Sequence, residues 1–143
     1  MNDQESLART RDRGGARVMW FAGITAVAGF LIVSPLISLT ATLFAWAFQR
    51  RNGALSEAEG VVALNWQLTY LAFQLMLVPL HLALVTVQRA TGQTWPLLTI
   101  SAILLLGTLN LVFSIVFGVR AGRGHPTRLF LAIPFIQKPP ERR

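Results

Sequence analysis

Three long stretches of this chain contain no charged residue. Val18–Phe48, Val61–Gln88 and Leu97–Val119 are 31, 28 and 23 residues long and lack Asp, Glu, Lys and Arg. About 20 apolar residues suffice for a helix to cross a bilayer. Over the whole chain only 13 % of residues are charged, against about 25 % in soluble domains. These stretches exclude a soluble or a disordered protein and predict an all-α integral membrane protein.

The second and third stretches each predict one transmembrane helix. As a helix, Leu97–Val119 rises about 35 Å, which spans a bilayer with some tilt. Val61–Gln88 rises about 42 Å, so we expect its first turns to lie among the lipid headgroups. Pro79 interrupts this second helix and removes one of its backbone hydrogen bonds. The polar residues Arg89–Pro96 form the turn between the two helices.

The first stretch is too long for one span and too short for two. A single helix over Val18–Phe48 would be about 46 Å long, against a bilayer core of about 30 Å. Ser34 precedes Pro35 at its middle, where a residue before proline resists helical geometry. The arms on either side rise only about 24 and 20 Å. We therefore predict a proline-broken helical hairpin that enters and leaves by one face, with a single crossing as the alternative.

The distribution of basic residues favours the hairpin. The chain has 13 Lys and Arg against 6 acidic residues, a formal net charge of +7. A hairpin places twelve of the basic residues on one side and Arg89 alone on the other, whereas a single crossing divides them five to eight. Because basic residues concentrate on the cytoplasmic side, we predict a multi-pass protein with a cytoplasmic N-terminus. Its basic residues should meet anionic lipid headgroups rather than nucleic acid.

The positions of the uncharged stretches divide the chain into a membrane domain and two flanking tails. Residues 1–17 form a basic polar N-terminal tail, residues 18–119 a helical membrane domain, and residues 120–143 a basic C-terminal tail. The uncharged core after residue 17 is about twice as long as that of a signal peptide, so we expect the N-terminal tail to be retained. The apolar run Leu129–Ile136 is too short to span and is predicted to lie along the membrane interface.

The chain carries no recognisable catalytic or metal-binding set. All six acidic residues lie outside the uncharged stretches, so no buried carboxylate is expected for acid–base chemistry. There is no Cys, and two His alone do not predict a metal site. No nucleotide-binding loop, nucleophile elbow or metalloprotease motif is present. We predict no enzymatic activity, no cofactor and no metal.

Polar residues in the last two spans are the candidate functional residues. In the second span they are Asn65, Gln67, Tyr70, Gln74 and His81, of which the two glutamines and the histidine are seven apart and share one stripe. In the third span Gly107, Asn110, Ser114 and Gly118 form a seam of small and polar residues suited to close helix packing. The stripe predicts interhelical hydrogen bonds, each stabilising by about 0.6 kcal/mol. A polar path or substrate groove is the alternative, and a role for His81 beyond packing stays open.

Two segments resemble a known family. Residues 59–69, EGVVALNWQLT, resemble the EALNFQLT signature of small bacterial membrane proteins of uncharacterised function. Residues 121–128, AGRGHPTR, and the later pair Phe135-Ile136 resemble its C-terminal motif, and Arg50-Arg51 its basic pair after a broken first segment. The family has Phe where Trp66 stands and an aromatic residue where His125 stands. The resemblance covers residues 17–136, and the family is distantly similar to the twenty-kilodalton component of the chloroplast inner-envelope import translocon.

The resemblance implies a compact helical protein of the bacterial inner (plasma) membrane with no established activity. The translocon role belongs to the plastid branch and is not implied by these residues. We therefore expect a non-enzymatic accessory or scaffold subunit that packs against other membrane proteins or copies of itself. A channel or translocation component that uses the polar stripe is the alternative. The two differ in whether the stripe faces the chain's own third span or a space between subunits.

Overall fold

The computed structural model describes residues 3–28 and 33–137, with the side chains of residues 26–28 left aside. Over this part the chain is helical and contains no strand. The helices are α1 (Asp3–Ala22), the 3-10 helix η1 (Gly23–Ala28), α2 (Ser34–Gln49), the 3-10 turn η2 (Arg50–Asn52), α3 (Ala54–Thr91) and α4 (Trp95–Gly122). Residues 123–137 follow without a helix. The prediction of an all-α membrane protein is confirmed.

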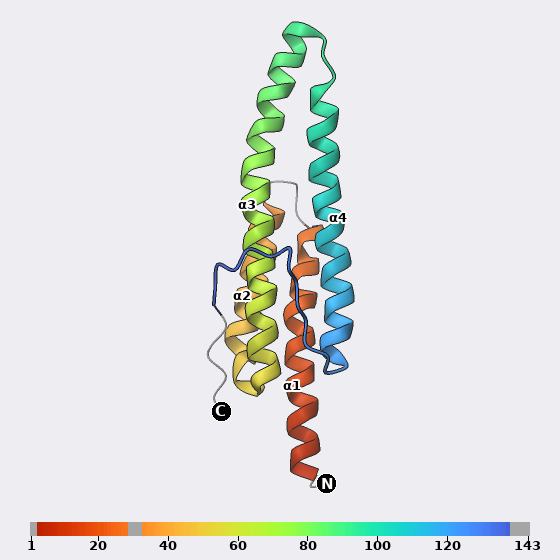
Figure 1. The fold of residues 1–143 in the computed structure, drawn as a ribbon. Coiled ribbons are helices and arrows are strands. Elements are labelled where there is room, and N and C mark those ends of the chain that lie inside the picture. Colours follow the sequence, from red (N-terminus) through yellow and green to blue (C-terminus); the bar gives the residue numbers. More distant parts are fainter. Residues whose placement is uncertain (1–2, 29–32, 138–143) are drawn as a thin grey trace.

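The first uncharged stretch forms a helical hairpin. α1 with η1 runs in one direction and α2 returns beside it, so the hairpin begins and ends at the same end of the molecule (Figure 1). α2 starts at Ser34-Pro35, the predicted break, because proline is accommodated in the first turn of a helix. The connecting residues 29–32 lie outside the described residues. The arrangement is that of the predicted hairpin rather than of a single crossing.

The second and third stretches form the two long helices. α3 and α4 extend beyond the predicted spans at both ends, and Pro79 lies inside α3 without ending it. α3 ends at Thr91 and is capped by Gly92. The φ of Gly92, 73°, is left-handed, a conformation that favours glycine, and its N–H donates to the Gln88 carbonyl. Both helices are long and apolar enough to span a membrane, yet only 11 % and 22 % of their most apolar 18-residue stretches are buried. Their apolar surface therefore faces outward, as in a membrane.

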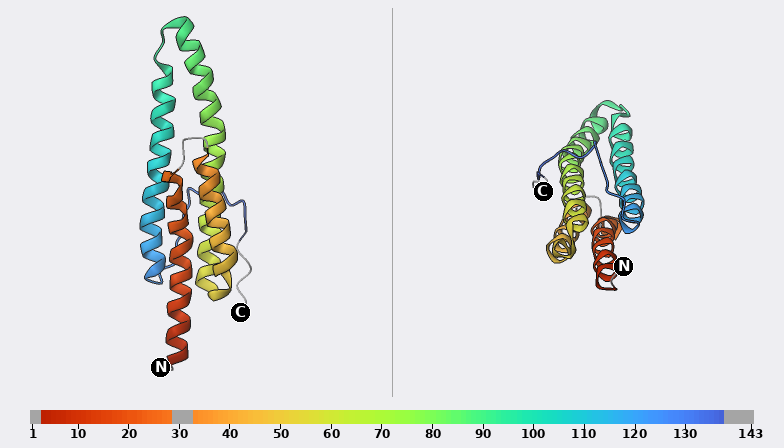
Figure 2. Two further views of the ribbon diagram at one scale, coloured as in Figure 1. Left: turned by 180° about the vertical axis from the view of Figure 1, so that it is seen from behind. Right: turned by 60° about the horizontal axis from the view of Figure 1, so that its bottom comes forward.

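The hairpin covers only one half of the α3–α4 pair (Figures 1 and 2). Every buried residue of α3 lies between Ser56 and Gln74, and none lies between residues 75 and 91. In the covered half α3 contacts α1, α2 and α4, whereas in the other half it pairs with α4 alone. The molecule is thus a four-helix bundle at one end and a two-helix hairpin at the other.

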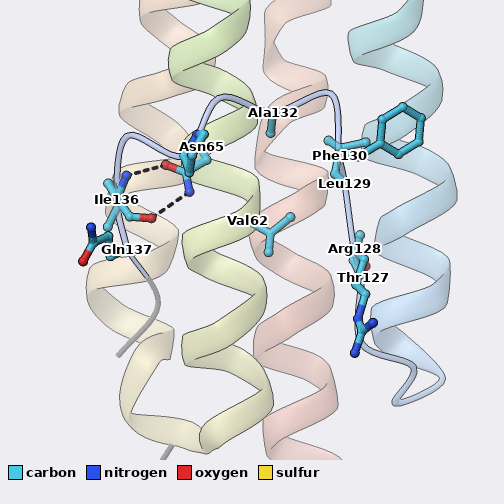
Figure 3. Close-up of a pocket in the computed structure, with 10 residues that line it drawn as sticks. Val62, Asn65, Thr127, Arg128, Leu129, Phe130, Ala132, Ile136 and Gln137 are labelled. Carbon is cyan, nitrogen blue, oxygen red and sulfur yellow. Dashed lines mark hydrogen bonds between the residues drawn. The ribbon is translucent and has the colours of Figure 1, made fainter. Parts of the chain in front are cut away.

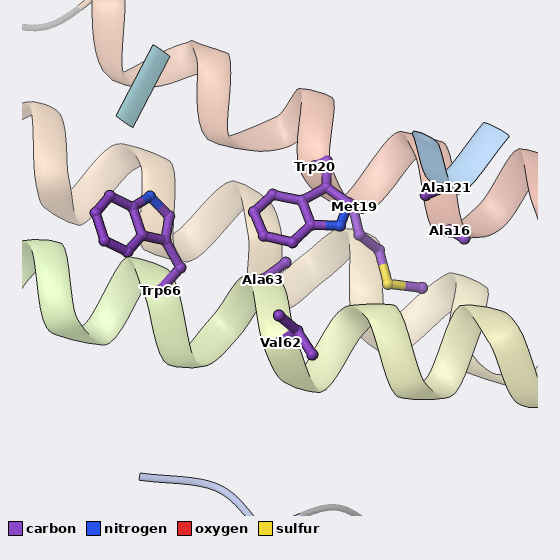
Figure 4. Close-up of a cluster of buried hydrophobic side chains, with 7 residues drawn as sticks. All are labelled: Ala16, Met19, Trp20, Val62, Ala63, Trp66 and Ala121. Carbon is purple, nitrogen blue, oxygen red and sulfur yellow. The ribbon is translucent and has the colours of Figure 1, made fainter. Parts of the chain in front are cut away.

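The core of the four-helix half consists of buried apolar side chains from α1, α3 and α4: Ala16, Met19, Trp20, Val62, Ala63, Trp66 and Ala121 (Figure 4). Two phenylalanines of α4 extend it, since the Trp20 and Phe117 rings lie 5.0 Å apart and those of Trp66 and Phe113 lie 4.9 Å apart. Gly60 allows α2 to approach α3, because a Cβ there would collide with the Trp46 ring and with Met19. Close packing in this half fixes the position of the hairpin.

The two predicted tails are ordered against the helices in their described parts. Residues 3–17, expected as a polar tail, are helical and continuous with the apolar part of α1. Asp12 of this helix accepts hydrogen bonds from the first-turn amides of α3, Leu55 N (3.2 Å) and Ser56 N (2.7 Å), which otherwise lack partners. At the other terminus the apolar run Leu129–Ile136 crosses the surface of α3 without spanning the molecule (Figure 1).

Candidate functional site: a buried polar network at the hairpin tip

The polar residues of the two long helices meet the tip of the hairpin. Asn110 Oδ1 on α4 accepts from Trp66 Nε1 (2.8 Å) and Gln67 Nε2 (3.1 Å) on α3. Asn110 Nδ2 donates to the carbonyl oxygen of Gly23 (3.2 Å), where α1 passes into η1. The Ser38 hydroxyl on α2 donates to Gln67 Oε1 (2.7 Å), with the Gly23 oxygen 3.1 Å away as a second acceptor. We call these five residues the hairpin-tip network.

The hairpin-tip network connects α2, α3, α4 and the end of α1 through polar groups that all have hydrogen-bond partners. Ser38 is fully buried, and Gln67 and Asn110 are each 1 % exposed. An unpaired polar group buried at such a site costs about 1–3 kcal/mol, so the mutual pairing favours this one arrangement of the helices. A Cβ at Gly23 would lie 2.5 Å from Ser114 Oγ and 2.6 Å from Gln67 Nε2, so any larger residue there would displace these side chains. The network holds the hairpin in register with α3 and α4.

The predicted polar stripe of α3 faces the interior and α4. Gln67 belongs to the hairpin-tip network, and Gln74 Nε2 donates to the Tyr70 hydroxyl at 3.4 Å. His81 Nδ1 lies 2.8 Å from Thr99 Oγ1, a hydrogen bond to α4. The Oε1 atom of Gln74 is buried and has no hydrogen-bond partner. The stripe is therefore used mostly between helices of one chain.

The predicted seam of α4 packs against the hairpin as well as against α3. A Cβ on Gly118 would lie 2.8 Å from the Phe21 ring of α1, and Ser114 is the residue that would meet a Cβ on Gly23. Gly107 is different, since its nearest outside atom is the Tyr70 hydroxyl, 3.9 Å from a Cβ there. The part of the seam formed by Ser114 and Gly118 thus accommodates the first hairpin arm, whereas Gly107 lies beyond the end of the hairpin.

Asn65 and Thr69 hold the C-terminal segment on α3. The Asn65 side chain donates to the Ile136 carbonyl (2.9 Å) and accepts from the Ile136 amide (2.7 Å), and Thr69 Oγ1 accepts from Ile133 N (2.9 Å). Irregular backbone near a membrane needs such partners, because lipid offers none. The segment leaves a cleft of about 560 Å³ against α3, lined mostly by apolar side chains, with Val62 behind it and Arg128 at one side (Figure 3).

One expectation about the acidic residues is wrong. Glu59 is only 1 % exposed, so the structure does bury a carboxylate, although it lies before the uncharged stretch in the sequence. Its oxygens accept from Trp20 Nε1 (2.7 Å) and from Thr127 N (2.5 Å), and so connect α1, α3 and the C-terminal segment. α3 starts well before the uncharged stretch, and the neighbouring chain segments cover these first turns. Glu59 lies seven residues before Trp66, a spacing that places both on one helical face.

Sequence reasoning also missed the polar residues of α2. Ser34, Ser38 and Thr42 are spaced by four and are all buried. A stripe of hydroxyls on an otherwise apolar helix was the available signal, because it marks the side that turns away from lipid. Among the described residues, no group of three His, Asp or Glu side chains is close enough to hold a metal ion. The chemistry that the arrangement supports best is hydrogen bonding between helices.

Comparison with known proteins identifies a family that this chain matches. Residues 16–136 match the model of the magnetosome magnetite crystal formation protein family, MamF/MmsF. This range is almost the same as the stretch 17–136 that carries the sequence resemblance, so the assignment to a small bacterial membrane-protein family is supported. Nothing supports the further similarity to the chloroplast import translocon. No curated protein and no solved structure matches the chain.

Proposed function

Because the match spans most of its length, the chain belongs to the magnetosome magnetite crystal formation protein family, and we propose that it assists crystal formation as a non-enzymatic accessory or scaffold subunit. The family match over residues 16–136 is the observation that carries this proposal. The protein sits in the membrane and packs against other membrane proteins or further copies of itself. Magnetite formation itself is the process it serves, not a reaction it catalyses.

The use of the polar side chains supports a scaffold over a channel. Gln67, Asn110 and His81 make hydrogen bonds within the chain, two of them directly between α3 and α4. A wet path would instead need such groups to face an open space between helices or subunits. The polar stripe is therefore better explained as stabilising one helix arrangement on which partners can dock.

The orientation we propose follows from charge and fold together. The basic residues of α1, the Arg50-Arg51 pair and the basic residues at the end of α4 lie at the four-helix end, whereas Arg89 lies near the opposite turn. The positive-inside tendency then assigns the four-helix end to the cytoplasm and makes the protein multi-pass in the bacterial inner membrane or a membrane derived from it. Its basic residues bind anionic headgroups there rather than nucleic acid.

Complementation tests this function. A magnetite-forming bacterium without its own family members receives this chain, and electron microscopy measures the number and size of the crystals. We expect the chain to restore crystals toward the unmodified strain, and unchanged crystals with normal protein accumulation would contradict the proposal. Cross-linking of native membranes followed by mass spectrometry identifies what the protein contacts.

A single substitution distinguishes the scaffold hypothesis from the channel hypothesis. His81→Leu removes the one titratable side chain of the α3 stripe and places an apolar side chain between α3 and α4 in its place. A scaffold should support crystals whenever this variant accumulates normally. Loss of crystal formation by a variant that accumulates and folds would favour a channel or translocation component instead.

A further inference from the structure

We propose that this protein prefers strongly curved bilayers, with its four-helix end in the leaflet of the convex face. The partner is a lipid surface, and the cause is the unequal area that the helices occupy in the two leaflets. This inference goes beyond the role in crystal formation and depends only on the placement of the helices in a membrane.

The uncharged part of α3 divides into two equal halves at Gln74. Val61–Gln74 and Leu75–Gln88 each rise about 20 Å. In the first half α3 is covered by α1, α2 and α4, and it contains most of the buried residues of the helix. In the second half no residue is buried, and apolar side chains such as Leu75 and Met76 are two-thirds exposed. One half of the apolar length is a four-helix bundle and the other a pair.

The depth of the hairpin can be derived from its contacts. Asn110 lies nine residues before Val119, the last residue of the uncharged part of α4, and so about 14 Å inside the apolar layer. Gly23 bonds to Asn110 and marks the same depth in the first arm. With a bilayer core of about 30 Å, this depth is close to the midplane. The hairpin therefore fills one leaflet, and among its described residues only η1 and the first turn of α2 extend past this depth.

The C-terminal segment enlarges the same half. It crosses α3 at Asn65 and Thr69, both in the covered half. Several of its large apolar side chains are exposed, with Phe130 91 % exposed and Leu131 51 % exposed. Such exposed apolar side chains contact lipid and add to the area of this leaflet.

The resulting shape is a wedge. A helix with its side chains is about 10 Å wide and so occupies about 80 Å² of membrane area. Two additional helices in one leaflet then add about 160 Å² there, without any counterpart in the other leaflet. A bilayer accommodates this excess with least strain where that leaflet is stretched, which is the convex side of a curved membrane. Insertion into one leaflet is sensitive to curvature for this reason.

Vesicle sorting tests the proposal. The fluorescently labelled full chain is reconstituted into phosphatidylcholine vesicles of mixed diameter, where uncharged lipid removes the contribution of the basic residues. Fluorescence microscopy of single vesicles then measures protein per membrane area against diameter. We expect a severalfold higher density on the smallest vesicles, with a terminal tag accessible to protease from outside. Equal density at all diameters would overturn the proposal.

Two matched double variants test the cause. Phenylalanine at the exposed positions Ala83 and Ser101 widens the two-helix half, whereas phenylalanine at the exposed positions Thr40 and Ala47 widens the four-helix half. The wedge predicts that A83F/S101F lowers the enrichment on small vesicles and that T40F/A47F keeps or raises it. Equal effects of both variants would also overturn the proposal, because the two pairs differ in added bulk by only one methyl group. Circular dichroism checks that both variants retain the helical content of the unmodified chain.

Discussion

Replacing Asn110 by leucine tests whether the hairpin-tip network fixes the fold. The substitution keeps a side chain of similar size in the middle of α4 but removes both the acceptor and the donor. Trp66 Nε1 and Gln67 Nε2 lose their shared acceptor, and the Gly23 oxygen loses one of its two donors. All the groups affected are buried, so no water replaces the lost partners.

The expected loss of stability can be bounded from these contacts. Two buried donors left unpaired cost about 1–3 kcal/mol each when nothing replaces the acceptor. Hydrogen bonds between helices in membranes contribute less on average, about 0.6 kcal/mol each, because the separated helices also find partners. These two estimates bound the destabilisation at about 2–6 kcal/mol, toward the lower end if the network rearranges around Ser38.

Equilibrium unfolding in mixed micelles, followed by circular dichroism, measures this free energy. The control is Thr108→Val on the same helix, since the Thr108 hydroxyl is exposed and bonds only its own helix at Leu104 O. It should change stability by less than about 0.5 kcal/mol. If Asn110→Leu were as mild as the control, the network would not be what holds the hairpin, and the argument from buried polar groups would be refuted.

Three further predictions follow from named contacts. Gly118→Ala should lower the thermal midpoint because the Phe21 ring has to move, whereas Gly107→Ala should keep or raise it, and equal responses would contradict the packing described. Cysteines introduced at Ala54 and Gln93 should react differently with an impermeant maleimide on intact cells. Only position 93 should be labelled, and labelling at 54 would disprove the hairpin topology. Glu59→Leu should loosen the C-terminal segment and accelerate its proteolysis, because the Trp20 and Thr127 N–H groups lose their acceptor, and an unchanged rate would show that the carboxylate is dispensable.

Three glycines near the helix ends are poor positions for the labelling cysteines. Gly92 and Gly124 have φ values of 73° and 82°, which disfavour cysteine. Gly53 lies against the Asp12 side chain, so a Cβ there would collide with it. Neighbouring positions with ordinary backbone geometry are therefore the better labelling sites for the same topological question.

The membrane helices and their order could be predicted from the sequence because they depend on local composition, whereas the helical structure of residues 3–17 was not predicted. Uncharged stretches of sufficient length identify α3 and α4, and Ser34-Pro35 identifies the break before α2. The imbalance of basic residues favoured the hairpin over a single crossing. The polar residues of α3 and α4 could likewise be named, since an amide in an apolar span needs a partner wherever that partner lies.

Only the tertiary structure decided which groups became partners and which were buried. Gln67 pairs with Asn110 and Ser38, residues far away in the sequence, because the hairpin packs beside α3 and α4 at this depth. Glu59 lies outside every uncharged stretch, yet it is buried because α1 and the C-terminal segment cover the first turns of α3. The difference between the four-helix half and the two-helix half likewise depends on where the hairpin packs on α3 and α4. Spans follow from composition along the chain, whereas pairing, burial and shape follow from where segments distant in sequence meet in space.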